Sequence, residues 1–288
     1  MPLDGPETRV DTAEDGWYWG APLPGGEFNA TVFIDASLCR KGVAQSGGLD
    51  KFYEALIARS ELLSDCLQGS RVGPVRGCDA TPFYDDAPAT ADTIKVGEAA
   101  FSIDPLSSQG VQTAIGSALH AAVVLHTILE HPDDTSLALE FYRMRQLESV
   151  ALHARAAGRF YGEAARSKTG EFWQARAVKV DSAERETPPL QQPALGAQIL
   201  IRLAPEARCE LIPSIQADFV VPAMALTFSG VAQPIAFLDG IEIGPLAAMI
   251  QRPATVEHVL RAWSQRIPPD RATAILGWLW ERGILVAH

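Results

Sequence analysis

The pattern of apolar and polar positions predicts strands in the first part of the chain. Two stretches, GWYWGAPL and ATVFIDA, contain the aromatic and β-branched residues typical of strands, and PGGEFN between them predicts a turn. Residues 49 to about 67 carry an apolar stripe at helical spacing, which predicts a helix. Two further strands are predicted at VRGCDATPFY and TIKVGEA, with an exposed loop between them.

Two long helices are predicted in the middle of the chain. Residues 109–131 are small or apolar at nearly every position, which predicts a helix that is buried on most sides and ends at Pro132. A second helix is expected from Thr135 or Ser136 to around Ser167, with its apolar positions turned inward.

A change of composition at residues 184–196, which are rich in proline and glutamine, predicts a linker. It divides the chain into a domain of residues 1–183 and a small C-terminal domain of residues 197–288. The C-terminal part predicts three helices and a short last strand, in the order of a winged-helix module. Because its last helix, ATAILGWLWERG, is mostly apolar, we expect it to pack against protein rather than DNA. The predicted fold class is α+β, with a mixed sheet and long buried helices.

Charge and composition remove several classes of function. The 288 residues include 35 acidic and 24 basic ones, and a net charge of −11 disfavours binding to nucleic acid. The longest apolar run, residues 121–129, is too short to span a bilayer, and the first residues lack the layout of a secretory signal. Four cysteines without CxxC spacing indicate reduced thiols and a cytoplasmic protein. The six histidines form no ligand pair, so no metal site is predicted.

Ligand-binding chemistry is concentrated between Ile94 and Ala122. A strand is expected to end at Gly97, a loop passes through Asp104, and Gly110 opens the long buried helix. The first N–H groups of a helix have no partner within it, and with the helix dipole they favour a partly negative ligand group. Glu98 could accept hydrogen bonds from a sugar hydroxyl. An ordinary turn and an ordinary serine N-cap explain these residues one by one, so it is their order that indicates a ligand.

The stretch GWYWGAPLPGG, residues 16–26, concentrates rigid aromatic surface beside prolines and glycines. One interpretation is a buried strand that runs into a tight turn. The other is the wall of a cofactor or substrate site.

Both stretches resemble motifs of one family, the flavin-dependent halogenases and related FAD-dependent monooxygenases. The run G-E-A-A, followed by D-P-L-S-S-Q-G-V, resembles the family's second FAD-contacting motif, in which G-D-A-A leads to D-P-x-x-S-x-G-V. Here Glu98 replaces the usual aspartate, which keeps the carboxylate on a longer arm. The run W-Y-W-G-A-P is similar to the family's W-x-W-x-I-P motif, with Ala21 in place of isoleucine. The resemblance covers about residues 16–167.

The resemblance implies FAD as cofactor and assigns roles to these positions. Gly97 and Glu98 would lie on the ribityl and phosphate side of the flavin. The residues it implies beneath the isoalloxazine ring belong to the second motif: Asp104, Pro105, Ser107, Ser108, Gln109 and Gly110. Val111, the next residue of the motif, is implied as a further cofactor-binding residue. The implied wall between flavin and substrate consists of Trp17, Trp19 and Pro22.

Two departures from the family change what is expected. Tryptophan halogenases carry a glutamate where Ser107 stands, which argues against tryptophan halogenation. The family's first unit, a βαβ element with G-x-G-x-x-G, and the lysine that follows it in halogenases are not found in this sequence. Most of the AMP half of FAD then lacks its binding surface. We therefore expect a truncated chain or one that a protein partner completes.

The resemblance implies a monooxygenase in which reduced flavin activates dioxygen. A C-terminal addition of this kind also occurs in flavin monooxygenases that modify peptidyl or carrier-bound substrates, so hydroxylation of such a substrate ranks above halogenation of a free one. Two other interpretations stay open. One is a non-catalytic remnant or binding module that holds no FAD, and the other is an α/β binding domain in which both motifs are coincidental.

Overall fold

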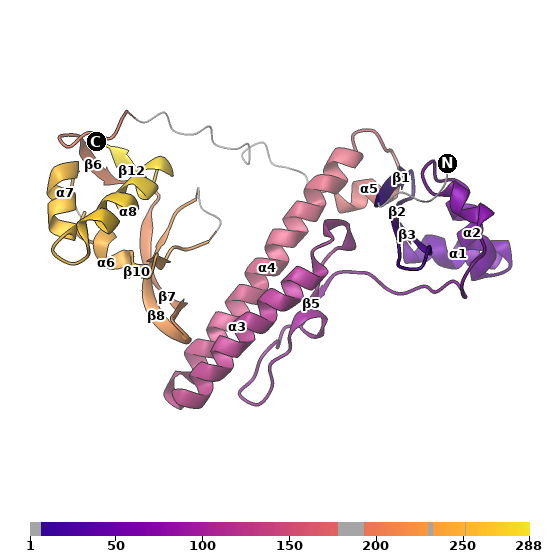
Figure 1. The fold of residues 1–288 in the computed structure, drawn as a ribbon, viewed down its shortest axis with the longest axis horizontal. Helices are drawn as coiled ribbons and strands as arrows, with labels where there is room; N and C mark the ends of the chain where they lie inside the picture. The colour runs from indigo at the N-terminus through magenta and orange to yellow at the C-terminus, as the bar shows by residue number, and fades with distance from the viewer. Residues whose placement is uncertain (1–6, 178–192, 230–232, 251) are drawn as a thin grey trace. The chain divides into compact units, whose positions relative to one another are not determined.

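The computed structural model describes residues 7–177, 193–229, 233–250 and 252–288 (Figure 1). These residues form two compact units, each built from separate stretches of chain. The first takes the described residues within 1–84, 102–110 and 149–181, and the second takes those within 85–101, 111–148 and 182–288. Most of the predicted linker lies outside the described residues, and the predicted domain boundaries stay a prediction.

The first unit contains a three-stranded antiparallel sheet in the order β1-β2-β3. Its strands are β1 (Arg9–Ala13), β2 (Gly16–Pro22) and β3 (Phe28–Ile34). The two strands predicted from the aromatic and β-branched residues are confirmed as β2 and β3, and β1 was not predicted. Successive side chains of β2 point to opposite faces, so Trp17 and Tyr18 enter two different apolar clusters.

Helices α1 (Ala36–Ser46) and α2 (Leu49–Ile57) follow the sheet, and a short 3₁₀ turn η1 (Ser64–Gln68) comes after them. The single helix predicted over residues 49–67 is therefore wrong in its second half. Ser60 interrupts it, because its hydroxyl donates to Asp11 Oδ2 at 2.7 Å and accepts from the Leu63 N–H at 3.1 Å. The missed helix α1 ends at Gly47, whose φ of 75° needs a glycine.

The two strands predicted over residues 75–84 and 93–99 are also mostly wrong. Only β4 (Phe83–Tyr84) forms from the first, and it pairs with β5 (Phe101–Ser102). In the second, Ile94 makes one isolated bridge to Ala89, and residues 97–99 form the 3₁₀ turn η2. Pro82 in the first stretch has no N–H to donate to a strand ladder, and Gly97 in the second has a φ of 55°, which a strand does not adopt.

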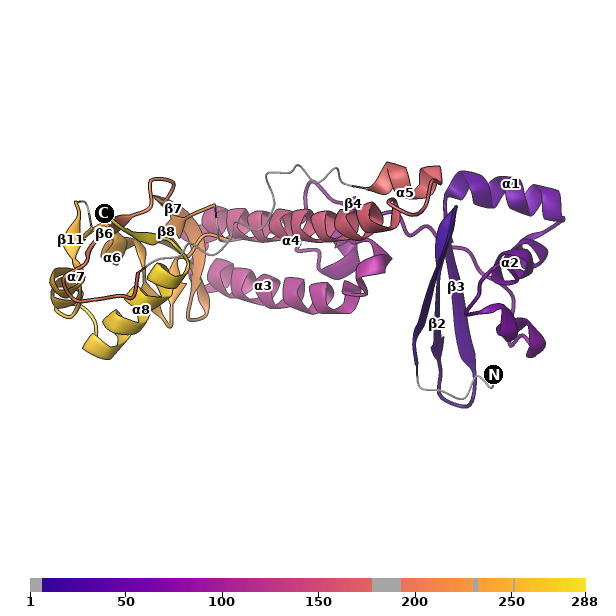
Figure 2. The ribbon, with the colours of Figure 1, turned by 90° about the horizontal axis from the view of Figure 1, so that it is seen from above.

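Two long helices are confirmed as α3 (Gly110–Glu130) and α4 (Thr135–Ala164), joined through the 3₁₀ turn η4 (Pro132–Asp134). In the second unit, α3 and the first half of α4 lie side by side (Figure 2). Val124, Phe141 and Tyr142 are buried between them. Val220, from the hairpin described below, joins the same cluster and covers the C-terminal half of α3.

The prediction that α3 is buried on most sides is wrong. One face carries a row of exposed apolar residues at helical spacing, which we call the α3 stripe: Val111, Ile115, Leu119, Leu125 and Leu129. Val111 is 78% exposed and Leu129 is 75% exposed. A sequence predicts that a face is apolar, but not whether the chain itself covers it. Within the described residues α3 is also the one helix whose length and apolar composition would suffice to cross a membrane, a test that core helices pass as well.

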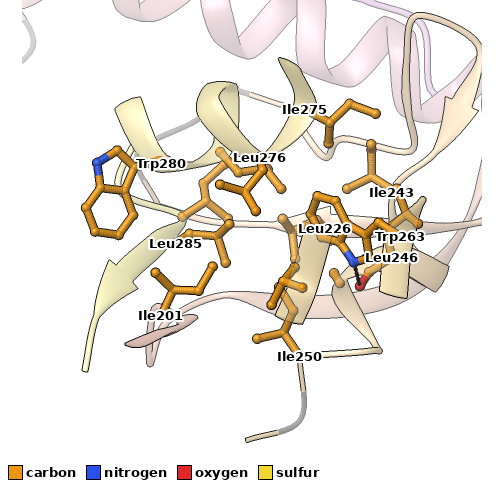
Figure 3. Packing of buried hydrophobic residues seen from close by; sticks show 14 of the residues in the cluster. Ile201, Leu226, Ile243, Leu246, Ile250, Trp263, Ile275, Leu276, Trp280 and Leu285 are labelled. Atoms are coloured by element: carbon orange, nitrogen blue, oxygen red, sulfur yellow. Dashed lines mark hydrogen bonds between the residues drawn. The ribbon is translucent and has the colours of Figure 1, made fainter. Parts of the chain in front are cut away.

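The C-terminal part of the second unit has its own core, shown in Figure 3. Its strands are β6 (Leu200–Leu203), β7 (Arg208–Gln216), β8 (Phe219–Thr227), β9 (Phe237–Leu238), β10 (Ile241–Glu242), β11 (Ala254–Thr255) and β12 (Leu285–Ala287). Its helices are α6 (Gly244–Ala247), α7 (Val256–Trp263) and α8 (Pro269–Glu281). The three predicted helices and the last strand are confirmed, whereas the long hairpin β7–β8 was not predicted.

The α+β class is thus confirmed at the level of mixed helix and sheet. Among the described residues, however, the strands form several small sheets instead of one mixed sheet, because most of them pair with a neighbour along the chain. In the C-terminal part, β6 lies between β11 and β12 and packs under α7 and α8. A winged-helix module has helices and a small sheet of this kind, and that assignment stays a prediction.

Candidate functional site

The tryptophan strand forms one wall of a buried aromatic cluster in the first unit. Trp17 is 3% exposed and stacks on its cross-strand neighbour Phe33, with ring centroids 3.8 Å apart. Trp19, two positions along the same face, packs against the cluster. Pro22 lies at the far end of β2, opposite Phe28. The stretch is therefore a buried strand before a turn, and its inner face carries the two tryptophans.

The loop of residues 104–110 has a defined shape. Asp104 caps the 3₁₀ turn η3 (Pro105–Ser107), because its Oδ1 accepts from the Leu106 N–H at 2.9 Å. The Ser107 hydroxyl donates back to the Asp104 carbonyl at 3.0 Å. Ser108 follows with φ of 53°, a left-handed conformation that is uncommon for a residue other than glycine. The sequence predicted a serine N-cap for the helix that begins at Gly110; Asp104 caps the short turn before that helix, and the serine cap stays a prediction.

Tyr161 of α4 joins the loop to the tryptophan strand. Its hydroxyl donates to Asp104, at 3.0 Å from Oδ2 and 3.2 Å from Oδ1. Its ring is 3% exposed and belongs to the same buried cluster as Trp17, against which Leu106 of the loop also packs. Burial raises the pKa of Tyr161, and the nearby charge of Asp104 raises that pKa further. The structure therefore brings the two predicted motifs together through a residue that sequence reasoning missed.

Helix α5 (Glu171–Arg176) contributes Phe172 and Trp173 to the same cluster. Trp173 donates from Nε1 to the Ala13 carbonyl at 2.7 Å, which ties α5 to β1. Arg176 pairs with Asp35 at 2.6 Å and lies 4.0 Å above the ring of Phe172. Nothing in the sequence marks the contacts of Trp173 with Ala13 and of Arg176 with Asp35, because each joins segments far apart in the chain.

Gly97 and Glu98 belong to the second unit. Gly97 has φ of 55°, and its N–H donates to the Ser117 hydroxyl of α3 at 2.8 Å. A Cβ at Gly97 would lie 3.0 Å from the Cβ of Ala114, so the turn approaches α3 closely and needs both a glycine and a small residue opposite. The sequence predicted a strand end here, but the motif forms a 3₁₀ turn packed on the helix, with Glu98 exposed.

The start of α3 is accessible from outside the chain. Ser108, Gln109 and Gly110 are partly or fully exposed, and a Cβ at Gly110 would meet no atom of the chain within 4 Å. The first N–H groups of the helix point away from its body and favour negative charge. The loop and the helix start therefore leave room for a partly negative group such as the carbonyl edge of a flavin. Among the residues that the structure describes, no group of three or more His, Cys, Asp and Glu side chains converges on a metal position.

The chain is similar to curated flavoenzymes over part of their length. No protein-family model matches it. It is 29% identical over 175 residues to tryptophan 2-halogenase from Chondromyces crocatus, which covers 60% of this chain and 33% of that one. It is 25% identical over 175 residues to LodB of Marinomonas mediterranea, a candidate FAD-dependent oxidoreductase by name, which covers 58% of this chain and 44% of LodB. The chain thus spans less than half the length of these relatives.

Two solved structures share the fold. One is the peptidyl tryptophan dihydroxylase QhpG, which is essential for tryptophylquinone cofactor biogenesis, with a TM-score of 0.76 and 25% identity over 98% of this chain and 62% of that one. The other is CmlS, a flavin-dependent halogenase, with a TM-score of 0.70 over 98% of this chain and 60% of that one. At 19% identity, CmlS shows the fold alone.

These likenesses place the fold among the halogenase-like folds of FAD-dependent enzymes. The predicted resemblance is confirmed, and the chain is related to the flavin-dependent halogenase-like family.

Proposed function

We propose that this chain forms the flavin-side wall and part of the substrate chamber of an FAD-dependent monooxygenase. One observation carries the proposal: the tryptophan strand and the 104–110 loop, the two motifs of the family, meet in one buried cluster in which Tyr161 contacts both. FAD, when bound, supplies the redox chemistry. The residues of the chain position the ring, separate it from the substrate and exclude water.

Each motif residue has a proposed role toward FAD. Gly97 and Glu98 bind the ribityl and phosphate side, the exposed Glu98 through its carboxylate. The loop from Asp104 to Gly110 lies beneath the isoalloxazine, where Ser107, Ser108 and Gln109 offer hydroxyl and backbone groups; Val111 follows the loop in the first turn of α3. Trp17, Trp19 and Pro22 form the wall toward the substrate.

A peptidyl or carrier-bound substrate is supported by the likeness to QhpG, a peptidyl tryptophan dihydroxylase, because that likeness covers 98% of this chain and so includes the C-terminal part. Ser107, in the position of the halogenase glutamate, favours hydroxylation over halogenation of tryptophan. Halogenation remains the second candidate, since a relative over 175 residues is a tryptophan 2-halogenase. All four cysteines are free thiols, which supports work in a reducing cytoplasm.

Uptake of FAD tests the proposal, and two glycines of α3 provide a matched pair of variants. A Cβ at Gly110 or at Gly116 would meet no atom within 4 Å, so Gly110→Ala and Gly116→Ala should both fold. The added methyl at Gly110 blocks close approach of the ring, so we expect weaker FAD binding in that variant alone. The measurement is the quenching of flavin fluorescence during titration, with absorbance after desalting. Equal binding by both variants would place the flavin elsewhere.

The α3 stripe supports the further proposal that a dinucleotide-binding unit, in the same polypeptide or in a partner, packs on α3. A continuous exposed apolar face of this kind marks an interaction surface, and it begins at Val111, next to the proposed flavin loop. The opposite side of α3 is already occupied, because Ser117 and Thr127 bond to Gly97 and Val220.

A variant with two substitutions in the α3 stripe tests whether this face binds protein. Ile115→Ser with Leu119→Ser should lower the self-association of the purified chain, measured by sedimentation velocity, and should prevent complex formation with an added dinucleotide-binding unit. The control is Val72→Ser, which is 75% exposed in a loop outside the stripe. Binding of the wild-type chain to lipid vesicles, abolished by the stripe variant, would instead identify a membrane as the occupant.

The rival proposal is a non-catalytic module that holds no FAD. It is favoured by one observation, that the sequence contains no G-x-G-x-x-G. A colourless protein that takes up no added FAD, alone or together with a dinucleotide-binding unit, would support it and refute the enzyme.

A further inference from the structure

We propose that Tyr161 is a positioning residue that fixes the Asp104 carboxylate, and through it the 104–110 loop, against the tryptophan strand. In this proposal the Asp104 carboxylate holds the loop in position and does not itself bind the cofactor. The meaning of this link for flavin binding rests on the proposed function, whereas the link itself is tested without flavin.

The carboxylate of Asp104 is occupied by donors of its own chain. Oδ1 accepts from the Leu106 N–H at 2.9 Å, and the Tyr161 hydroxyl lies 3.0 Å from Oδ2. Both are hydrogen bonds to a charged acceptor, which are the stronger kind. A carboxylate held from two sides is a fixed point of the loop, so the backbone beyond it, from Ser107 onward, is the part left to face a ligand.

Tyr161 is fixed independently of the loop. Its ring is buried between Phe172 and Trp173, whose centroids lie 6.0 Å and 5.8 Å away, and the Arg176 guanidinium lies 6.0 Å from its centroid. Close packing on these sides leaves the phenol one position. Because burial raises its pKa, the hydroxyl stays protonated and donates to Asp104 throughout the neutral range. The loop therefore takes its position from Tyr161 and not the reverse.

The loop needs such an anchor because of its backbone. Ser108, with φ of 53°, is held in a left-handed conformation that is unfavourable for a residue with a side chain. The turn η3 is only three residues long, and its cap alone does not connect it to any other element. The Tyr161 hydroxyl and the packing of Leu106 on the cluster supply that connection.

The test compares two tyrosines of α4. Tyr161→Phe removes one hydroxyl, and Tyr142→Phe is the matched control, since Tyr142 is also buried and donates to the Lys95 carbonyl at 2.6 Å. Amide hydrogen exchange of Leu106, Ser107 and Ser108 is measured in each. We expect exchange about tenfold faster in Tyr161→Phe, the size expected when a hydrogen bond to a charged group is lost, and no change in Tyr142→Phe.

A double variant separates positioning from general loosening. If Tyr161 acts through Asp104, Tyr161→Phe combined with Asp104→Ala exchanges no faster than Asp104→Ala alone, because the same link is not lost twice. Additive effects, unchanged loop exchange, or equal acceleration of β2 would overturn the inference. Should Tyr161→Phe fail to fold, Asp104→Ser tests the link from the loop side, because serine keeps a cap acceptor for the Leu106 N–H but has no carboxylate for the Tyr161 hydroxyl. This variant must accelerate exchange in the loop and leave exchange in β2 unchanged.

The flavin measurement distinguishes this inference from the proposed function. With FAD added, Tyr161→Phe should bind more weakly than wild type while Tyr142→Phe binds equally. A chain that binds no FAD but shows the predicted loop exchange refutes the proposed function and leaves the link in place. A chain that binds FAD in all variants with unchanged loop exchange refutes the link.

Discussion

Two regions of the second unit differ in the burial of their apolar side chains. In the C-terminal part, Trp263, Leu276 and Leu279 are fully buried, and the Trp263 Nε1–H donates to the Leu246 carbonyl at 3.0 Å (Figure 3). On α3, the leucines at 119 and 129 are 65% and 75% exposed. Both regions are rich in apolar residues, so the difference lies in what covers them.

This difference teaches where to look for function. Where a region buries its apolar residues, those residues form the core that stabilises its fold, and substitutions there lower the free energy of unfolding. An apolar helix face that stays exposed contributes little to the stability of the chain, and it marks a surface for interaction instead. The contrast can be tested with the same substitution made in both places.

The largest expected effect is that of Leu276→Ala. Leu276 is 0% exposed in the C-terminal core, and emptying such a site costs about 2–5 kcal/mol of unfolding free energy. The same substitution at Leu119, 65% exposed on the stripe, should change that free energy by less than about 0.5 kcal/mol. Urea unfolding followed by tryptophan fluorescence measures both. A large loss at Leu119 would mean that the chain covers the stripe in solution.

An intermediate effect is expected where the covered side of α3 meets the hairpin β7–β8. Thr127 is 0% exposed; its hydroxyl donates to the Val123 carbonyl and accepts from the Val220 N–H at 2.9 Å. Thr127→Val leaves that buried N–H without its acceptor, which costs about 1–3 kcal/mol.

Thr273→Val is the control for that substitution. Thr273 makes the same bond to the carbonyl four residues earlier, on Pro269, but is exposed on α8. We expect its free energy of unfolding to change by less than about 0.5 kcal/mol. Faster amide exchange of Val220 in Thr127→Val alone would locate the loss at the hairpin. Equal effects of the two variants would show that the contact with the hairpin contributes no stability.

The sequence predicted those elements whose cause is local. The run of small and apolar residues predicted α3, the 3.6-residue period predicted α4, and the aromatic run predicted β2. Prediction from the sequence failed where a contact with a distant residue determines the local structure. The helix from residue 49 stops early because Ser60 bonds to Asp11, 49 positions away, and Tyr161 meets Asp104 across 57 positions. The motif spacing identified both halves of the candidate site, but the residue that joins them carries no local signal.

The smallest expected effect concerns pH and the side of α3 that α4 covers. Burial lowers the pKa of His120, the positive Arg145 lowers it further, and Glu148 opposes them. Phe141 lies edge-on, 5.7 Å from the imidazole. Because the folded chain disfavours the proton, the unfolded chain binds more protons as the pH falls below about 6.5, the ordinary value. Stability is therefore complete above that pH and falls as the pH drops through the lowered pKa.

His120→Gln should reduce the dependence of stability on pH, measured as the slope of the free energy of unfolding between about pH 5 and pH 7. Part of the slope should remain, since burial also lowers the pKa of His153. His258→Gln, at an exposed position on α7, should leave the slope as it is in the wild type. If His120→Gln kept the full slope, the imidazole would be reached by water, and the side of α3 that faces α4 would be as open as the stripe.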